Sequence, residues 1–168
     1  MRLFFACWPP VETAQALARW AAEVRNESGG KVTAVENIHL TLAFLGNAEP
    51  DKAIAAARRV NGRRHELPID AARYVKRNEM VWVGPVAVPE PLLALAAELQ
   101  ASLRAAGFAL EERPFAAHVT LIRKARRPAS IPPLPSVAWP VHEFLLISSR
   151  TSAEGSTYQS VERFPLLR

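Results

Sequence analysis

Two copies of a short His-x-Thr-Leu motif are the residues of this sequence best suited to chemistry. The first copy is residues 39–42 (His-Leu-Thr-Leu), and the second, nearly half a chain later, is residues 118–121 (His-Val-Thr-Leu). Alternate side chains of a β-strand face the same side, so each histidine should project beside its threonine. The intervening apolar residues would point the other way, into packing. Two such strands facing each other would surround one small space with two imidazoles and two hydroxyls.

That set of side chains suits the cleavage of a phosphodiester bond. The reaction needs one group to take a proton from the attacking oxygen and another to give a proton to the leaving oxygen. Histidine can do both near neutral pH, because its unperturbed pKa is about 6.5. Threonine hydroxyls can donate hydrogen bonds to the non-bridging phosphate oxygens, where negative charge builds up. We therefore predict that His39 and His118 form an acid–base pair and that Thr41 and Thr120 contact the phosphate.

Recurrence of the motif is what favours a functional role over a structural one. A single histidine on an apolar strand is more often a core residue than a catalyst, and either motif alone would be weak evidence. The chain has only four histidines, and two of them head the same four-residue pattern. The other two, His65 and His142, lie outside any such pattern and are expected to be structural or exposed.

The elements that must position these motifs follow from apolar periodicity and turn residues. A stripe of leucines at helical spacing between Pro91 and Gly107 is the clearest helix signal. The predicted helices cover residues 11–26, 50–60 and 91–107, and the predicted strands cover residues 3–8, 38–45, 67–74, 80–83, 115–122, 141–149 and 157–164.

The order of these elements resembles two copies of one plan, each with a helix followed by a motif-bearing strand. It predicts one α+β domain over residues 1–168, bilobal and pseudo-twofold, with approximate halves at residues 1–84 and 85–168. A doubly wound parallel sheet is the alternative. It requires strict alternation of strands and helices, which the two closing strands interrupt.

Composition limits the partners and the chemistry. The 168 residues are 49% apolar, enough for a buried core, and the net charge of +5 with a pI of about 10.0 favours anionic partners such as nucleic acid. The single cysteine, Cys7, excludes an internal disulfide and a zinc–thiolate cluster and is expected to be a small buried hydrophobe. None of the glycines forms a phosphate-binding loop.

The first apolar run, residues 3–8, is followed at once by two prolines. It is too short for the apolar region of a signal peptide with its cleavage site, and no later stretch is long enough to span a membrane. The sequence therefore predicts a cytoplasmic protein that does not associate with membranes.

Around the two motifs, the sequence resembles the bacterial RNA 2′,3′-cyclic phosphodiesterases, also called 2′-5′ RNA ligases, of the two-histidine phosphoesterase superfamily. The likeness is strongest over residues 36–46 and 113–121, which contain the two motifs in the form HxTx. Weaker matches, in the correct order, extend it over nearly the whole chain: residues 1–4, 81–84 and 149–151, Tyr158, and residues 164–166.

The resemblance implies two mainly antiparallel sheets flanking a central cleft, with helices on the outside. It implies that RNA ending in a 2′,3′-cyclic phosphate is hydrolysed to a 2′-phosphate without a metal or other cofactor. By this likeness His39 is the proton donor to the leaving 3′-oxygen and His118 is the proton acceptor that activates water. The residues alone do not distinguish these two roles. A monomer is expected.

Additional substrate contacts are predicted at Arg123 and Phe115. The family often has a basic residue at the position of Arg123, and a guanidinium can bind two phosphate oxygens at once. Strand alternation, however, places Arg123 opposite His118, so a bulge or a strand end would be needed for it to reach the cleft. Alternation favours Lys124 instead. Phe115 could stack on a base, whereas Phe44 is expected to pack in the core.

Other functions remain open from the residues alone. The same four side chains could join RNA ends in the 2′-5′ sense, with a 5′-hydroxyl in place of water, or could act on small cyclic nucleotides. A non-catalytic RNA-binding module would use the histidines only to hold phosphate, and a purely structural α+β domain would use them for packing.

Overall fold

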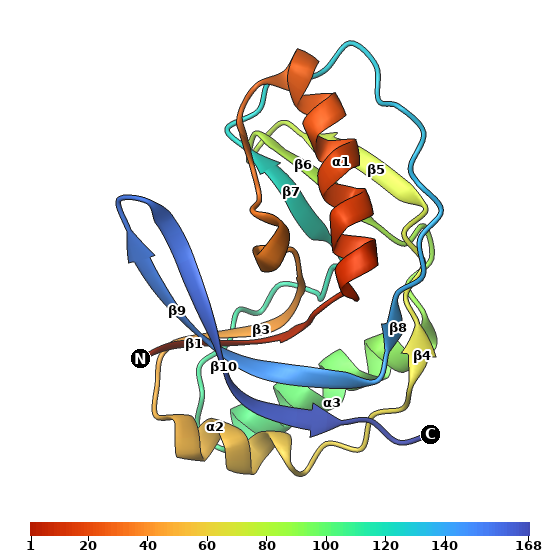
Figure 1. Ribbon diagram of the computed structural model, residues 1–168. Helices are drawn as coiled ribbons and strands as arrows, with labels where there is room; N and C mark the ends of the chain where they lie inside the picture. The colour runs from red at the N-terminus through yellow and green to blue at the C-terminus, as the bar shows by residue number, and fades with distance from the viewer.

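Two four-stranded sheets with helices on their outer sides build the computed structural model, which describes residues 1–168 (Figure 1). In the order of hydrogen-bonded neighbours, sheet A consists of β10 (Gly155–Pro165), β9 (Glu143–Ser152), β1 (Arg2–Cys7) and β3 (Leu40–Asn47), and sheet B consists of β2 (Lys31–Val32), β7 (Val119–Arg123), β6 (Met80–Gly84) and β5 (Ala71–Val75). All paired strands of both sheets are antiparallel. The predicted α+β class with two antiparallel sheets is therefore confirmed.

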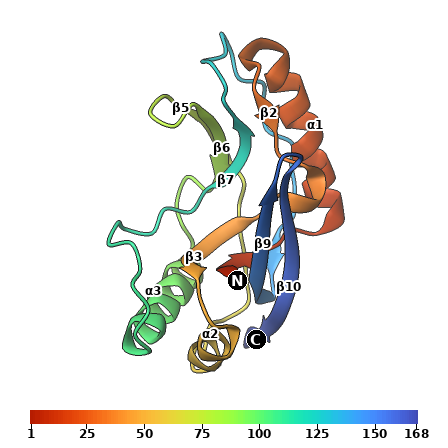
Figure 2. The same cartoon turned by 90° about the vertical axis from the view of Figure 1, so that its left-hand side faces the viewer.

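Three helices cover the sheets. Helix α1 (Val11–Ser28) packs on sheet B, whereas α2 (Pro50–Ala57) and α3 (Glu90–Ala105) lie together below sheet A. The connections add the short helix η1 (Val35–Asn37) and a two-stranded ribbon of β4 (His65–Glu66) and β8 (Pro140–Val141). Figure 2 shows the two lobes from the side, with β3 of one facing β7 of the other.

Each sheet draws strands from both halves of the sequence. In sheet A, β1 and β3 come from the first half and β9 and β10 from the second, and in sheet B, β7 comes from the second half. Helix α1 follows β1 of sheet A but packs on sheet B. Because neither lobe is a continuous stretch of chain, we propose that residues 1–168 form one bilobal domain.

Helices α1 and α3 begin and end within two residues of the predicted positions, whereas α2, predicted over residues 50–60, ends at Ala57. Pro91 lies in the first turn of α3, and the leucine stripe of that helix is fully buried: Leu92, Leu95, Leu99 and Leu103. Helix α1 ends at Gly29, whose φ of 61° lies in the left-handed region that glycine adopts without strain.

Sheet A has apolar side chains on both of its faces. Phe5 belongs to the main core, which continues behind both sheets, whereas Phe4, Ala6 and Ile147 form a second, smaller buried cluster on the opposite face. Trp8, Leu145 and Tyr158 pack against this second cluster. Its position decides the surroundings of the first histidine.

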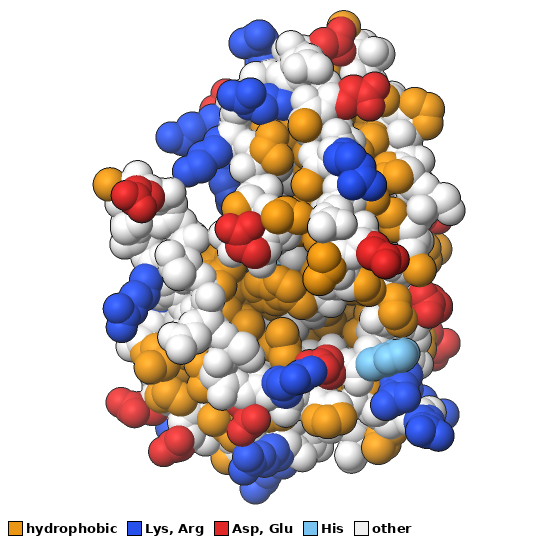
Figure 3. Space-filling model, viewed as in Figure 1, with side chains coloured by type: hydrophobic (Ala, Val, Ile, Leu, Met, Phe, Trp, Pro, Cys, Tyr) orange, Lys and Arg blue, Asp and Glu red, His pale blue; other side chains and the backbone are white.

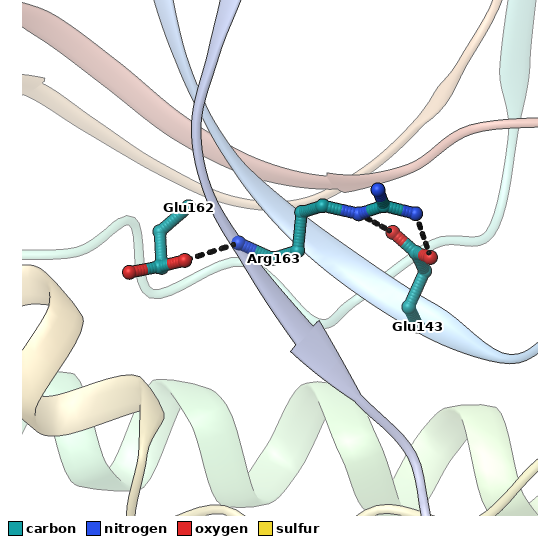
Figure 4. A network of polar contacts seen from close by, with 3 residues as sticks. All are labelled: Glu143, Glu162 and Arg163. Atoms are coloured by element: carbon teal, nitrogen blue, oxygen red, sulfur yellow. Dashed lines mark hydrogen bonds and ion pairs between the residues drawn. The ribbon is translucent and has the colours of Figure 1, made fainter.

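Strands β9 and β10 form a long hairpin that extends beyond the rest of sheet A (Figure 1). Near its base, the Arg163 guanidinium donates two hydrogen bonds to the Glu143 carboxylate, at 2.9 and 2.7 Å, and the Arg163 backbone N–H donates to Glu162 (Figure 4). Near its tip, the Asn37 side chain donates to the Ser156 carbonyl at 3.1 Å. The hairpin therefore contacts the segment that leads into the first motif.

Some predicted boundaries are wrong. The strands expected over residues 38–45 and 115–122 begin only at Leu40 and Val119, one residue after each histidine. The strand expected from residue 67 begins at Ala71, and residues 31–37, for which no helix or strand was predicted, contain the short β2 and η1. Local propensity does not show these ends, because each depends on which backbone groups find partners in a neighbouring strand.

Candidate active site

His39 lies at the entrance to β3, half-buried, with both ring nitrogens engaged. Its Nδ1 lies 2.6 Å from the Asn37 carbonyl oxygen, and its Nε2 lies 3.1 Å from the Thr41 hydroxyl oxygen. A carbonyl can only accept, so Nδ1 carries a hydrogen and Nε2 of the neutral ring accepts from Thr41. The expected projection of His39 and Thr41 to one side is confirmed.

His118 lies at the entrance to β7 in an equivalent arrangement. Its Nδ1 donates to the Ala116 carbonyl at 2.9 Å, again the residue two positions earlier. Its Nε2 has no hydrogen bond to the protein. Both histidines are thus held in the same tautomer, with Nε2 as the nitrogen available for chemistry, and that of His118 is the freer of the two.

A tryptophan stacks on each imidazole. The ring centroids of Trp8 and His39 are 4.7 Å apart at 12° between planes, and those of Trp82 and His118 are 3.9 Å apart at 20°. Tyr158 meets His39 edge to face at 5.4 Å. None of these aromatic residues was predicted as a site residue. Trp8 follows the end of β1, the neighbour of β3, and Trp82 lies on β6, the neighbour of β7, and the sequence alone does not show that these strands are neighbours.

A β-bulge follows the threonine of the first motif. Thr41 pairs with Ala6 but Ala43 pairs with Phe5, so Leu42 is an extra residue in β3. Leu42 and Ala43 are both buried, and Phe44 then returns to the face of Thr41. The Phe44 side chain is 62% exposed and lies 5.8 Å from the ring of Phe4. The prediction that Phe44 packs in the core is wrong, because simple alternation does not include the bulge.

An equivalent bulge follows the threonine of the second motif. Thr120 pairs with Trp82 but Ile122 pairs with Val81, so Leu121 is an extra residue in β7. Leu121 and Ile122 are both fully buried, which leaves Arg123 exposed on the face of Thr120. The bulge that Arg123 needed to reach the histidines is therefore present. Lys124 adopts a left-handed φ of 55° beyond the strand end.

Burial and nearby positive charges lower the pKa of both motif histidines. The pKa of His39 is lowered to about 4, mainly by burial; the hydrogen bond to Asn37 opposes this shift, and the charges of Arg123 and His118 contribute to it. Burial also lowers the pKa of His118, with Arg123 and Arg73 adding to the effect. Arg123 thus acts on both imidazoles, and the charge of His118 also acts on His39 across the space between the sheets.

The remaining candidate residues lie in different parts of the protein. Phe115 is half-buried and packs against the main core. Cys7 is buried, as expected, and burial raises the pKa of its thiol to about 12. His142 is exposed, and His65 lies in the ribbon strand β4 with its Nδ1 donating to the Arg63 carbonyl. Neither of these two histidines takes part in the aromatic stacks around the motifs.

Neither a metal cluster nor a membrane helix is evident. Nowhere do three or more His, Cys, Asp or Glu side chains come together in a way that could hold a metal ion. All three helices are too short or too polar to cross a lipid bilayer.

Comparison with known proteins gives a consistent result. The family model described as LigT like Phosphoesterase matches twice, over residues 8–82 and 83–158. The chain is 35% identical to the RNA 2′,3′-cyclic phosphodiesterase of Escherichia coli strain K12, covering 98% of this chain and 96% of that protein. It is 32% identical to the protein of the same name from Thermus thermophilus, covering 99% and 90%. The crystal structure of E. coli LigT complexed with 3′-AMP superimposes with a TM-score of 0.92 at 32% identity, covering 99% and 98%.

Proposed function

The chain belongs to the LigT-like phosphoesterase family, and from that membership we propose that it hydrolyses RNA 2′,3′-cyclic phosphates through His39 and His118. The observation that carries the proposal is the matched pair of imidazoles. Each is fixed at Nδ1 by a carbonyl two residues earlier, is stacked on a tryptophan, and presents Nε2.

Water attacks phosphorus and gives its proton to the Nε2 of His118. The bond from phosphorus to the 3′-oxygen breaks, and that oxygen takes a proton from Nε2 of a protonated His39, which leaves a 2′-phosphate and a 3′-hydroxyl. The assignment of His39 as proton donor and His118 as proton acceptor comes from the family likeness. The structure supports it in one respect: Nε2 of His118 makes no hydrogen bond to the protein and is free to accept, whereas Nε2 of His39 is already engaged by Thr41.

Three further side chains would bind the phosphate. Thr41 and Thr120 share the faces of their histidines and would donate hydrogen bonds to the non-bridging oxygens. Arg123, whose charge acts on both imidazoles, would offset the negative charge that accumulates there. Phe115 is a weaker candidate, since it packs against the core. All these residues come from one chain, so we propose that a monomer is sufficient.

A short RNA with a 2′,3′-cyclic phosphate end, incubated with the protein in excess EDTA, tests the proposal. We expect complete conversion to a 2′-phosphate end at the rate seen without chelator, because the acid–base steps use only imidazoles. Product is identified by its resistance to an enzyme that removes only 3′-phosphates. An intact cyclic end with and without Mg²⁺ would contradict the function, and loss of activity only in EDTA would contradict metal independence.

The pH dependence of kcat/KM follows from the histidine pKa values, because kcat/KM reports ionisation in the free enzyme. The reaction needs His39 charged and His118 neutral, and both pKa values lie below 6.5. We therefore expect a maximum between about pH 4 and 6.5 and a decline of roughly tenfold per pH unit above it. The optimum for kcat should lie higher, since bound phosphate stabilises the protonated His39. A kcat/KM plateau extending to pH 8 would contradict this.

A further inference from the structure

A row of side chains runs across sheet B from the second motif to the outer strand. Thr120 pairs with Trp82 across β7 and β6, and Trp82 pairs with Arg73 across β6 and β5. Cross-strand partners project from the same face of a sheet, so the three side chains share the face that carries the motif. The row thus leads from the proposed phosphate site to the edge of the sheet.

Arg73 is held at the end of this row by the tryptophan. Its guanidinium carbon lies 5.9 Å from the centroid of the Trp82 ring, which stacks at 3.9 Å on His118. These distances place the guanidinium within the span of one or two nucleotides from the imidazole. Cation–π contact restrains the arginine without using its hydrogen-bond donors.

Arg73 has no acidic partner. The three ion pairs of the protein are Arg58–Glu162, Arg113–Glu111 and Arg163–Glu143. Figure 4 shows what such pairing does at Arg163, where the carboxylate of Glu143 takes two donors of the guanidinium. At Arg73 those donors are exposed and available to an external anion. Figure 3 shows further Lys and Arg side chains gathered along the edge of the same lobe, facing the notch beside the β9–β10 hairpin.

We propose that Arg73 binds the phosphate next to the reacting one, on the 5′ side of the RNA, so that the enzyme prefers an oligonucleotide end to a cyclic mononucleotide. This inference rests on the proposed function and specifies its substrate. A nucleotide chain whose cyclic phosphate sits between His39 and His118 has its remaining phosphates only on the 5′ side. The row through Trp82 offers a path for that chain, and a guanidinium recognises a phosphate through two parallel hydrogen bonds.

The test compares two substrates in the parent protein and in Arg73→Gln: adenosine 2′,3′-cyclic phosphate and the dinucleotide ApA ending in a 2′,3′-cyclic phosphate. The measured quantity is the ratio of kcat/KM for the dinucleotide to that for the mononucleotide, at one pH. Any effect of the substitution on His118 cancels in this ratio. We expect the parent to favour the dinucleotide and R73Q to lower the ratio about tenfold. Arg77→Gln, in the exposed turn after β5, is the matched control and should leave the ratio unchanged.

The outcomes separate the two proposals. An unchanged ratio in R73Q, or a ratio lowered equally by R77Q, would overturn the role of Arg73 while the hydrolysis of both substrates upholds the function. If neither substrate is hydrolysed, the proposed function fails. In that case the binding of ApA with a 2′-phosphate, compared with adenosine 2′-phosphate by calorimetry, still decides: equal loss of affinity for both ligands in R73Q overturns the subsite, and a selective loss for the dinucleotide supports it.

Discussion

Substitution of His118 or His39 by alanine is expected to lower kcat on an RNA 2′,3′-cyclic phosphate by roughly 10² to 10⁴, because in the proposed mechanism each imidazole carries one proton transfer. In the proposed mechanism, alanine at position 118 removes the group that takes a proton from water. Alanine at position 39 leaves the 3′-oxygen to depart as an alkoxide. Steady-state kinetics with a defined oligonucleotide measure both effects. The double variant should lose little more than the worse single one, since the two groups act in one step.

His142→Ala is the matched control, because His142 is the exposed histidine outside the site, and it should retain full activity. Thermal unfolding of each variant separates lost chemistry from lost structure. A folded H39A or H118A protein within threefold of the parent rate would remove the basis for acid–base catalysis at this site.

Arg123→Gln should produce the second-largest loss, roughly 10- to 100-fold in kcat/KM. Hydrogen bonds to charged groups contribute about 1.5–3 kcal/mol, and glutamine keeps much of the length of the side chain while removing its charge. Because the charge of Arg123 lowers the pKa of both histidines, its removal should also raise both pKa values. We therefore expect the kcat/KM maximum to move to higher pH, measured across the pH range in buffers of constant ionic strength.

Lys124→Asn is the control for this effect. Lys124 follows Arg123 directly but lies beyond the bulge with a left-handed backbone, a conformation that asparagine tolerates. It should change the rate by less than threefold and leave the pH optimum in place. The reverse pattern, with K124N impaired and R123Q active, would mean that simple strand alternation describes the site better than the bulge does.

The placement of the motif side chains was predictable from the sequence because it depends only on the period of two along a strand. The pairing of His39 with Thr41 and the burial of Leu40 between them need only the alternation of a strand. The helices were also predictable; α3, for example, has a continuous leucine stripe between a proline and a glycine. Two antiparallel sheets were expected only through the family resemblance.

The two bulges were not predictable, although they decide which side chains reach the histidines. Leu42 and Leu121 have nothing in their type to mark them as extra residues. The bulge exists because the neighbouring strand, β1 or β6, supplies one partner fewer. Register between strands distant in sequence is a tertiary property. For the same reason, simple alternation wrongly placed Phe44 in the core and Arg123 on the face opposite His118.

The contacts of Trp8 and Arg73 were also hidden, since each meets its histidine through a neighbouring strand. Trp8 continues from β1 to reach the ring of His39, and Arg73 reaches His118 only across Trp82. A single sequence records neither the pairing of β5 with β6 nor that of β6 with β7. In the sequence, nothing distinguishes Arg73 from the many other Lys and Arg residues.

The place of β1 in sheet A, between β3 and β9, has a consequence for biosynthesis. At about 5–20 residues per second, β3 leaves the ribosome within seconds of β1, but β9 follows only on the order of ten seconds later. During that interval the apolar strand Arg2–Cys7 has one open edge, the kind of surface that pairs with foreign strands. The nascent chain is thus prone to such pairing until β9 is translated, and arrival of the β9–β10 hairpin ends that period.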